Sequence, residues 1–596
     1  MTDPLPIDEA LPELRAALST SRNVVLQAPP GAGKSTRVPL ALLDEAWVQD
    51  RKIVMLEPRR LAARAVATRM AGTLGEQIGG TVGYRTRLDT RVGSKTRIEV
   101  VTEGVLTRWL QRDPALEGVA LVIFDEFHER SLQADLGLAL TLDAQATLRE
   151  DLRVLVMSAT LDSAAVARSL GDAPIVSSSG RSYPVETHYR EPLSRAARSA
   201  SPERPLAEIV AATVVRALET EHGDVLVFLP GQGEIHRTLR LLEEHQLPPG
   251  TRVLPLYGDL PIEQQDEAIR PSRPGSRKVV LATNIAETSL TIEGIRIVVD
   301  SGLERRMRFD PPTGMSRLET TRISRASADQ RRGRAGRLEP GVCYRLWSES
   351  EHASLAARSP AEILEADLAP LALELANWGV ADPLALKWLD PPPAAAFTQA
   401  RDLLRSLEAL DRDGRITEHG RAIAALGTHP RLAHMIVRSL ELGGTRLALE
   451  IAALLGERDV LRSIDRSASD IDLRLRLDAI RERSKPRGFT VDAAARQRVL
   501  RSVDQLARQL RIDPNTADRG DVDRDTGVLL ALAYPDRIAM ARGGSGRYLL
   551  SSGRGAQVVG TQSLAQEEFL VVADLDAGER EATIRLAAPL ARKDLE

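Results

Sequence analysis

The chain has 596 residues, of which 43% are hydrophobic and 27% are charged. Such values are typical of a globular protein that is too long for one hydrophobic core and divides into several domains. Its single cysteine, Cys343, excludes an intramolecular disulfide and a cysteine-cluster metal site. The net charge of −3 excludes a uniformly basic coat, so a nucleic acid would have to be held in a locally positive groove.

No apolar stretch approaches the ~20 residues that a membrane span needs. The N-terminus, "MTDPLPIDEA", lacks the basic and then apolar pattern of a signal peptide. We therefore expect a cytoplasmic protein with no membrane partner.

Arginine dominates the basic residues, since only seven of the 80 are lysine. Recognition of phosphate by guanidinium groups is one explanation. Codon bias in a GC-rich genome is the other, and the abundance of alanine favours it. The arginine count alone therefore carries no functional conclusion.

From residue 20 to about 345, short apolar strands alternate with amphipathic helices. Continuous Val/Ile/Leu runs are typical of parallel strands that are covered on both faces. The runs lie at 23–28, 52–57, 120–124, 153–158, 224–229, 278–283 and 295–300. The pattern predicts an α/β fold, with a second α/β unit that opens near Gly180 and a surface loop at 190–206.

After residue 345 the pattern changes to helices, which we expect at 360–379, at 394–410 and onward to about 512. A small hairpin is expected at 411–420, "DRDGRITEHG". Short strands with glycine-rich turns are expected at 527–558, where they predict a small β-barrel.

The segment "QAPPGAGKSTRVP" (27–39) follows a strand and opens a helix, which is the context of a phosphate-binding P-loop. Glycines let backbone N–H groups close on phosphate oxygens. Lys34 would reach the β- and γ-phosphates, and the Ser35 hydroxyl would ligate Mg²⁺. A chance glycine-rich turn is the alternative, which the strand, the lysine and the hydroxyl residues disfavour. The residues expected at the nucleotide are Pro30, Gly31, Ala32, Gly33, Lys34, Ser35 and Thr36.

The segment "VALVIFDEFHERS" (119–131) delivers two carboxylates to the tip of an apolar strand. We expect Asp125 to hold Mg²⁺ through water, and Glu126 to lie at the metal and to orient or deprotonate the attacking water. Two solvated carboxylates that cap the next helix are the alternative. The upstream P-loop favours catalysis. Phe127 has no proton to move and is expected to serve packing.

The segment "SADQRRGRAGR" (327–337) concentrates arginine inside the second α/β unit. A spacing of three predicts that Arg334 and Arg337 lie on one helical face and point at one γ-phosphate. Gln330 is expected to align the water. A generic basic segment is the alternative. With these roles, hydrolysis requires both α/β units to close on one nucleotide, as in a motor.

Taken together, the motifs resemble those of superfamily 2 helicases of the DEAH/RHA group, most closely the bacterial HrpB type. They lie in the family's order at 28–36, 57–70, 102–106, 125–128, 158–160, 227–235, 283–292 and 330–337. Phe127 replaces the group's usual alanine. The resemblance implies two tandem RecA-like P-loop domains followed by winged-helix, helical-bundle (ratchet) and OB-like domains. The implied boundaries are 1–178, 179–345, 346–428, 429–518 and 519–596.

The resemblance also implies roles for single residues. Contacts with the nucleic-acid backbone fall to Arg59, Arg60, Thr102, Gly231, Thr283 and Asn284. Ser289 would sense the γ-phosphate, and His128 would link the nucleotide site to the 330–337 motif. Arg69 would stack on the base, with Ile269 in place of the usual aromatic on its other face. Residues 303–318 correspond to a strand-separating hairpin, for which a plain surface hairpin is the alternative.

The implied function is that of an ATP-dependent RNA helicase that moves 3′ to 5′ along a single strand and unwinds duplexes. ATP with Mg²⁺ is the expected cofactor, and other nucleoside triphosphates are possible because no adenine-selecting glutamine motif precedes residue 27. We expect a monomer that binds single-stranded RNA, or DNA, with no protein partner indicated. HrpB-like proteins usually continue beyond "LARKDLE", so the chain is expected to be part of a longer protein.

Two other functions fit parts of the pattern. The chain could be an RNA-stimulated NTPase that remodels RNA–protein complexes without unwinding duplexes, against which only the 303–318 hairpin argues. It could also be a nucleotide-regulated binding module. The complete set of Lys34, Glu126, Gln330, Arg334 and Arg337 argues against a module that has lost catalysis.

Overall fold

The structure, a computed structural model, describes residues 4–595 apart from 87–88, 160–162, 181–182, 191–204, 289–291, 312–313, 465–469, 484–487, 514–519, 545, 561 and 577–580. The chain forms two compact units. The first comprises residues 1–308, 317–366 and 384–391, and the second comprises 309–316, 367–383 and 392–596. Most of the loop expected at 190–206 lies outside the described residues.

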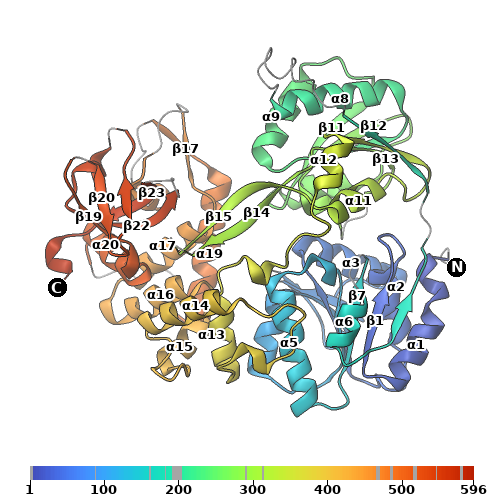
Figure 1. Cartoon of the computed structure of the whole chain (residues 1–596), viewed down its shortest axis with the longest axis horizontal. Coiled ribbons are helices and arrows are strands. Elements are labelled where there is room, and N and C mark those ends of the chain that lie inside the picture. Colours follow the sequence, from blue (N-terminus) through green and yellow to red (C-terminus); the bar gives the residue numbers. More distant parts are fainter. Residues whose placement is uncertain are drawn as a thin grey trace. The chain divides into compact units, whose positions relative to one another are not determined.

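The first unit begins with an eight-stranded sheet in the order β4-β3-β5-β2-β6-β7-β1-β8, drawn in blue to cyan in Figure 1. Its pairs are parallel except for β3 with β4. The strands are β1 (Asn23–Gln27), β2 (Lys52–Glu57), β3 (Val82–Arg85), β4 (Thr90–Arg91), β5 (Ile98–Thr102), β6 (Val119–Phe124), β7 (Arg153–Ser158) and β8 (Ile175–Ser177).

Helices cover both faces of this sheet because its strands are apolar on both sides. Buried side chains of α1, α2 and α3 join alternate strand residues in one core. On the other face, Gly137 of α5 lies against side chains of α4, β2 and β6. The helices of this part are η1 (Pro6–Glu9), α1 (Leu11–Thr20), α2 (Lys34–Leu42), α3 (Arg60–Thr73), α4 (Glu103–Arg112), η2 (Phe127–Glu129), α5 (Leu132–Thr147) and α6 (Ser163–Ser169).

A second, six-stranded sheet follows in the order β11-β12-β10-β13-β16-β9, with every pair parallel. Its strands are β9 (Val185–Tyr189), β10 (Asp224–Phe228), β11 (Thr251–Leu256), β12 (Arg277–Ala282), β13 (Ile295–Asp300) and β16 (Gly341–Arg345). The accompanying helices are α8 (Leu206–Thr220), α9 (Gln232–Glu243), α10 (Ile262–Ile269), η3 (Asn284–Ala286), α11 (Arg325–Gly333), α12 (Glu349–Ser354) and η4 (Glu362–Leu364).

Between β13 and α11 the chain forms a two-stranded hairpin of β14 (Leu303–Asp310) and β15 (Met315–Arg322), as expected for 303–318. The hairpin tip belongs to the second unit. There Met315 joins the core of a small barrel, and Gly314 O accepts a hydrogen bond from Arg537 at 2.6 Å. The strands of the hairpin near its root belong to the first unit.

The second unit combines helices with a closed barrel in the order β19-β20-β21-β23-β22, drawn in red in Figure 1. Its helices are α13 (Ala369–Trp378), η5 (Pro383–Ala385, shared with the first unit), α14 (Ala394–Ser406), α15 (Glu418–Ala425), α16 (Pro430–Leu442), α17 (Thr445–Gly456), α18 (Leu473–Arg481), α19 (Ala493–Leu510), α20 (Val522–Ala533), η6 (Pro535–Arg537), η7 (Ser563–Gln566) and η8 (Arg592–Asp594). Its strands are β17 (Leu461–Ser463), β18 (Phe489–Val491), β19 (Ile538–Ala541), β20 (Arg547–Leu550), β21 (Gly555–Gln557), β22 (Phe569–Asp576) and β23 (Ala582–Pro589).

The predicted α/β fold and the terminal barrel are therefore confirmed, but details differ. The first residues of the 527–558 segment are not a strand, because α20 runs to Ala533 and only residues from Ile538 join the barrel. The Asp521 side chain caps α20 by accepting a hydrogen bond from Asp523 N at 3.0 Å. At 411–420 the expected hairpin is reduced to a single antiparallel bridge between Leu410 and Ile416.

Candidate active site

The loop after β1 has the backbone that a phosphate cradle requires. Gly31 and Gly33 have φ of 85° and 94°, in the left-handed region that favours glycine. A Cβ on Gly33 would also lie 2.6 Å from Leu5 Cδ1. Lys34 then begins α2 and is buried. The loop is thus followed by a helix N-terminus, where backbone N–H groups attract anions.

Lys34 is paired with the two carboxylates that follow β6. Its Nζ donates a hydrogen bond to Glu126 Oε1 at 2.8 Å and lies 3.8 Å from Asp125 Oδ1. Burial disfavours the charged ammonium, but Glu126 and Asp125 outweigh burial and raise the pKa of Lys34. The lysine is therefore charged and already bound to an anion of the protein.

Glu126 is held in a strained backbone conformation with φ of 49°. Burial would raise its pKa, but Lys34 and His128 hold the pKa of Glu126 at about 2. His128 Nδ1 lies 3.3 Å from Glu126 Oε2, and neither ring nitrogen makes a hydrogen bond to a described residue. The described contact of His128 is therefore with Glu126, and its expected link to the 330–337 motif stays a prediction.

Phe127 packs in the core, as expected. Its side chain is 1% exposed and meets Phe124 edge to face, with ring centroids 6.2 Å apart. The guanidinium of Arg130 lies 5.8 Å from the Phe127 ring. The aromatic ring therefore contributes packing beside the carboxylates.

The residues around Asp125 fit a magnesium ion bound together with phosphates. Burial raises the pKa of Asp125 and the charge of Lys34 opposes it, with the Ser35 hydroxyl acting in the same direction as Lys34. Asp125 Oδ2 is buried and has no hydrogen-bond partner among the described residues. Mg²⁺ prefers such oxygen ligands and takes its remaining ligands from water and phosphate. No group of three or more His, Cys, Asp or Glu side chains in the described part of the chain forms a metal site by itself.

Glu57, at the end of β2, is a third carboxyl group beside this pair. It is fully buried, and burial together with the charges of Asp125 and Glu126 raises its pKa well above the usual range. Sequence reasoning assigned Glu57 no role, although it is the first residue of the 57–70 motif, because it has the position of a polar residue that ends an apolar strand.

Arg334 and Arg337 lie beyond the helix on which they were expected. Helix α11 ends at Gly333, so the two arginines occupy the turn that follows rather than one helical face. Arg334 Nε donates to Glu287 O at 2.9 Å, and Arg334 Nη2 donates to Thr288 O. Two carbonyl oxygens of the 287–288 loop therefore fix the Arg334 guanidinium.

Arg337 lies beside the P-loop, and the charge of Arg334 interacts with that of Glu126. A Cβ on Gly31 would lie 3.8 Å from Arg337 Nε. Burial lowers the pKa of Arg337 to about 10, with Glu126 opposing. Burial and the charge of Arg337 lower the pKa of Arg334 well below its usual value, again with Glu126 opposing. Buried cations that disfavour one another in this way complement an anion such as a triphosphate.

Contacts between the two sheets involve several residues that were assigned to nucleic acid. Arg59 Nη1 donates to Asn284 O at 2.5 Å, and Arg59 Nη2 lies 3.2 Å from the Glu129 carboxylate. Glu129 also accepts a hydrogen bond from Thr288 Oγ1. Sequence reasoning missed Glu129 as the bridge, although it lies only three residues after Glu126.

The other expected nucleic-acid residues occupy loop and helix-start positions. Arg60 is exposed at the start of α3. Thr102 precedes α4, and Gly231 precedes α9, where a Cβ would lie 3.0 Å from the Arg305 guanidinium. Thr283 caps η3 by accepting a hydrogen bond from Ile285 N at 3.5 Å.

The residues expected at the base lie on two helices that touch. Arg69 is exposed on α3, and Ile269 is half-buried at the end of α10. Arg64 of α3 and Asp266 of α10 form an ion pair of 2.7 Å.

Gln330, which was expected to align the water, lies half-buried on α11. Ser289, the expected γ-phosphate sensor, lies outside the described residues.

Comparison with known proteins agrees with this geometry. Residues 8–168 match the DEAD/DEAH box helicase model, and residues 207–339 match that of the helicase conserved C-terminal domain. The chain is 46% identical over 588 residues to the ATP-dependent RNA helicase HrpB of Escherichia coli (strain K12), an alignment that covers 98% of this chain and 68% of that protein. The chain belongs to the HrpB family of DEAD/DEAH box helicases.

This helicase also has a more distant relative in the pre-mRNA-splicing factor ATP-dependent RNA helicase prp22 of Schizosaccharomyces pombe. The two are 39% identical over 459 residues, which is 76% of this chain and 38% of that protein. Two crystal structures of E. coli HrpB, one described as a DExH-box NTPase and one as a DEAH/RHA helicase, match at 45% identity. Their TM-scores are 0.83 and 0.84, and the matches cover 100% and 99% of this chain and 69% and 71% of theirs. Within the described residues, no helix has both the length and the apolar character to cross a membrane.

Proposed function

We propose that this chain is an NTP-driven RNA helicase that translocates 3′ to 5′ along single-stranded nucleic acid and separates duplexes. The observation that carries the proposal is the meeting of two sheets at one phosphate cradle. Arg337 lies beside Gly31 of the P-loop, while Lys34 is paired with Glu126. Because the two sheets contribute opposite walls, hydrolysis would change how they contact one another.

We propose that nucleotide binding begins with an exchange of anions at Lys34. A triphosphate offers the ammonium a higher negative charge than Glu126 does, so Lys34 would turn toward phosphate. Removing that ammonium from Glu126 removes the main charge that holds the carboxyl pKa at about 2. Glu126 would then become a stronger acceptor for the attacking water.

The remaining roles follow from position. Ser35 and Asp125 would hold Mg²⁺, which neutralises phosphate charge when it is bound. Arg334 and Arg337 would stabilise charge on the transferred phosphoryl group, with Gln330 aligning the water. Arg69 and Ile269 would flank the base. With an aliphatic residue in place of an aromatic ring on one face, we expect weak selection of ATP over other nucleoside triphosphates.

We propose that RNA contacts fall on the loops that carry Arg59, Arg60, Thr102, Gly231, Thr283 and Asn284. Hydroxyls, guanidinium groups and main-chain N–H groups at these positions would bind phosphate and sugar, which carry no sequence information. The hairpin of β14 and β15 would separate strands. We also propose the five-domain division given by the sequence, for which the closed barrel supports the last boundary.

The test is NTP turnover measured together with strand displacement. The purified chain is given ATP and Mg²⁺, with and without single-stranded RNA or DNA, and then duplexes that carry a 3′ or a 5′ single-stranded tail. We expect RNA-stimulated turnover and displacement of the 3′-tailed duplex. Stimulated turnover without displacement would favour an RNA-remodelling NTPase, and turnover that ignores nucleic acid would contradict both.

A further inference from the structure

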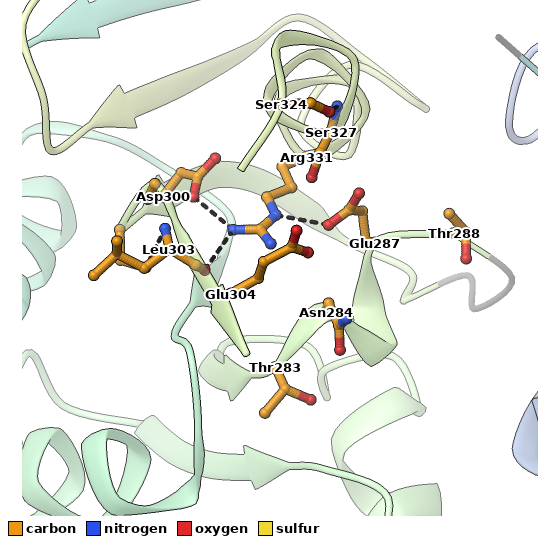
Figure 2. A network of polar contacts seen from close by, with 12 residues as sticks. Thr283, Asn284, Glu287, Thr288, Asp300, Leu303, Glu304, Ser324, Ser327 and Arg331 are labelled. Carbon is orange, nitrogen blue, oxygen red and sulfur yellow. Dashed lines mark hydrogen bonds and ion pairs between the residues drawn. The ribbon is translucent and has the colours of Figure 1, made fainter. Parts of the chain in front are cut away.

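Arg331, the arginine that follows Gln330, is the largest fully buried side chain of the chain's described part. Its Nε donates to Glu287 Oε2 at 2.8 Å, and its Nη1 donates to Asp300 Oδ1 at 3.0 Å and to Leu303 O at 3.2 Å. Figure 2 shows the guanidinium between these groups. None of the roles proposed above uses Arg331.

The three hydrogen-bond partners of Arg331 belong to three different structural segments. Glu287 lies in the loop whose carbonyl oxygens hold Arg334. Asp300 ends β13, the strand that precedes the hairpin. Leu303 is the first residue of β14 and thus the root of the hairpin itself. The Arg331 guanidinium therefore connects the loop that holds Arg334 with the first residue of the strand-separating hairpin.

The root of the hairpin is built to transmit a displacement rather than absorb it. Gly302 has φ of 73°, and a Cβ there would lie 2.7 Å from the Trp347 ring, so the turn is tight and packed. Gly302 N donates to Asp300 Oδ1 at 2.9 Å, and Ile323 N donates to Gly302 O at 3.1 Å. Both ends of the hairpin are thus tied to the same turn.

Helix α11 completes the connection along the chain. Strand β15 ends at Arg322, and two residues later Ser324 caps α11, its hydroxyl accepting from Ser327 N at 3.2 Å. Arg334 follows the last helical residue at the other end. A single nine-residue helix therefore runs from the return strand of the hairpin to the arginine, and Arg331 ties its last turn back to β14.

We propose that Arg331 is a positioning residue that couples the nucleotide site to the hairpin through Glu287, Asp300 and Leu303. The inference rests on the proposed helicase function. A planar guanidinium holds its donors in a rigid fork, whereas the three donors of an ammonium rotate about one bond and fix no such plane. Charge-assisted contacts in a buried site allow few alternative arrangements. Movement of the motif that carries Arg334 therefore moves the hairpin root with it.

The experiment separates coupling from hydrolysis. Asp300→Asn keeps the size of the side chain but removes the charge that Arg331 binds, and Asp300 touches no part of the proposed nucleotide site. We expect NTP turnover within about twofold of the parent, while duplex displaced per NTP hydrolysed falls about tenfold. Arg331→Lys, which keeps the charge but not the fork, should lower the same ratio and serves if Asp300→Asn does not fold.

Asp224→Asn is the matched control. Asp224 is a buried carboxylate at the opposite end of the same sheet, where it accepts hydrogen bonds from Ser272 Oγ at 2.7 Å and from Lys278 N at 2.9 Å. It should leave displacement per NTP unchanged even if it lowers the apparent Tm. An equal fall in the Asp224 and Asp300 variants would assign the effect to stability and overturn the inference, as would an unchanged ratio in the Asp300 variant.

Hydrogen exchange gives a readout that needs no unwinding. Amides of residues 303–308 and 317–322 are followed with and without Mg²⁺ and adenylyl imidodiphosphate. We expect a nucleotide-dependent change in the parent that is lost in Asp300→Asn and kept in Asp224→Asn. A change that persists in Asp300→Asn overturns the coupling while leaving the helicase function intact. A parent that hydrolyses NTP but displaces no strand would reject both.

Discussion

The two parallel sheets of the first unit each have a buried cation beside the edge where their strands end, and the two cations are held in opposite ways. Lys34 binds Glu126 through one 2.8 Å contact, next to an Asp125 oxygen that has no hydrogen-bond partner among the described residues. Arg331 makes three contacts and lies 4.9 Å from the Phe228 ring. An oxygen without a described hydrogen-bond partner is present at both places, since Asp300 Oδ2 has none either, so the two sites differ in the number of contacts that hold the cation.

This difference indicates which ion pair is exchanged during function and which is permanent. A lysine that binds one carboxylate can transfer to phosphate without leaving several groups unsatisfied. Breaking the Arg331 cluster would leave Glu287 and Asp300 without their cation in a buried site, which costs about 3–5 kcal/mol for such pairs. We therefore interpret the Lys34–Glu126 ion pair of the first sheet as the one that is exchanged during function. The Arg331 cluster of the second sheet is then the permanent one.

The largest expected effect is that of Glu126→Gln, which removes the anion that competes for Lys34. We expect kcat to fall about 10³-fold because the water loses its acceptor. Nucleotide affinity should be unchanged or tighter, since Lys34 is then free to bind phosphate. Steady-state turnover with RNA and titration with a fluorescent nucleotide measure the two quantities.

Glu117→Gln is the control, because Glu117 is exposed at the other end of β6. It should change neither quantity. Normal turnover in Glu126→Gln would remove Glu126 as the base. Weaker nucleotide binding would instead contradict the exchange at Lys34.

Arg334→Ala tests whether an arginine of the second sheet contributes to hydrolysis of the nucleotide that the first sheet binds. Glu287 O and Thr288 O hold the Arg334 guanidinium in place through two hydrogen bonds from the same sheet. We expect hydrolysis to slow at least about a hundredfold with little change in the Kd for nucleotide. Arg332→Ala is the matched control, since the Arg332 side chain on α11 is 43% exposed and its ion pair among the described residues is a 3.9 Å contact with Asp329. An unchanged rate in Arg334→Ala would mean that the two sheets do not share one nucleotide.

Much of this fold could be predicted because its strands are continuous apolar runs. The boundaries of β2, β7 and β13 agree with the expected 52–57, 153–158 and 295–300. Strand β5 was missed because Glu99 interrupts its apolar run. In the folded protein Glu99 is buried and satisfied by Lys52 Nζ at 2.5 Å and Arg85 Nε at 2.7 Å, contacts that no local pattern reveals.

The α20 segment shows a different limit. "GVLLALA" is a short apolar run that periodicity alone assigns to neither strand nor helix. The upstream Asp521 that caps the helix was the available signal. Conversely, the end of α11 at Gly333 moved Arg334 and Arg337 off the predicted helical face without moving them out of reach of the P-loop.

The site was predictable where one segment carries it, as in the P-loop and the two carboxylates after β6. It was not predictable where partners are distant in the chain. Arg331 meets Glu287, 44 residues away, and Thr288 meets Glu129, 159 residues away. A motif identifies such residues as unusual but not what they touch.

A half-buried carboxylate, Glu103, sharpens the comparison by its pH dependence. Glu103, the first residue of α4, accepts a hydrogen bond from Ser131 Oγ at 2.6 Å and has no cationic partner among the described residues. Burial raises its pKa from 4.5 to about 8, with Ser131 opposing and the charges of Glu129 and Glu362 adding to the shift. Lys34 holds the pKa of Glu126 at about 2, whereas the pKa of Glu103, which has no cationic partner among the described residues, is raised.

The sign of the stability effect follows from the two pKa values. Between 4.5 and about 8 the unfolded carboxyl group has lost its proton while the folded one keeps it, so stability falls as pH rises and the contribution is lost through about pH 8. The substitution Glu103→Gln removes this pH-dependent loss of stability. It also keeps a side-chain oxygen that can accept the hydrogen bond from Ser131 Oγ. We expect its apparent Tm to match the parent near pH 5 and to exceed it at about pH 8.5, by about 2–4 °C for each kcal/mol recovered. Thermal melts across this range, with Glu117→Gln as the flat control, would contradict the assignment if the difference shrank with rising pH.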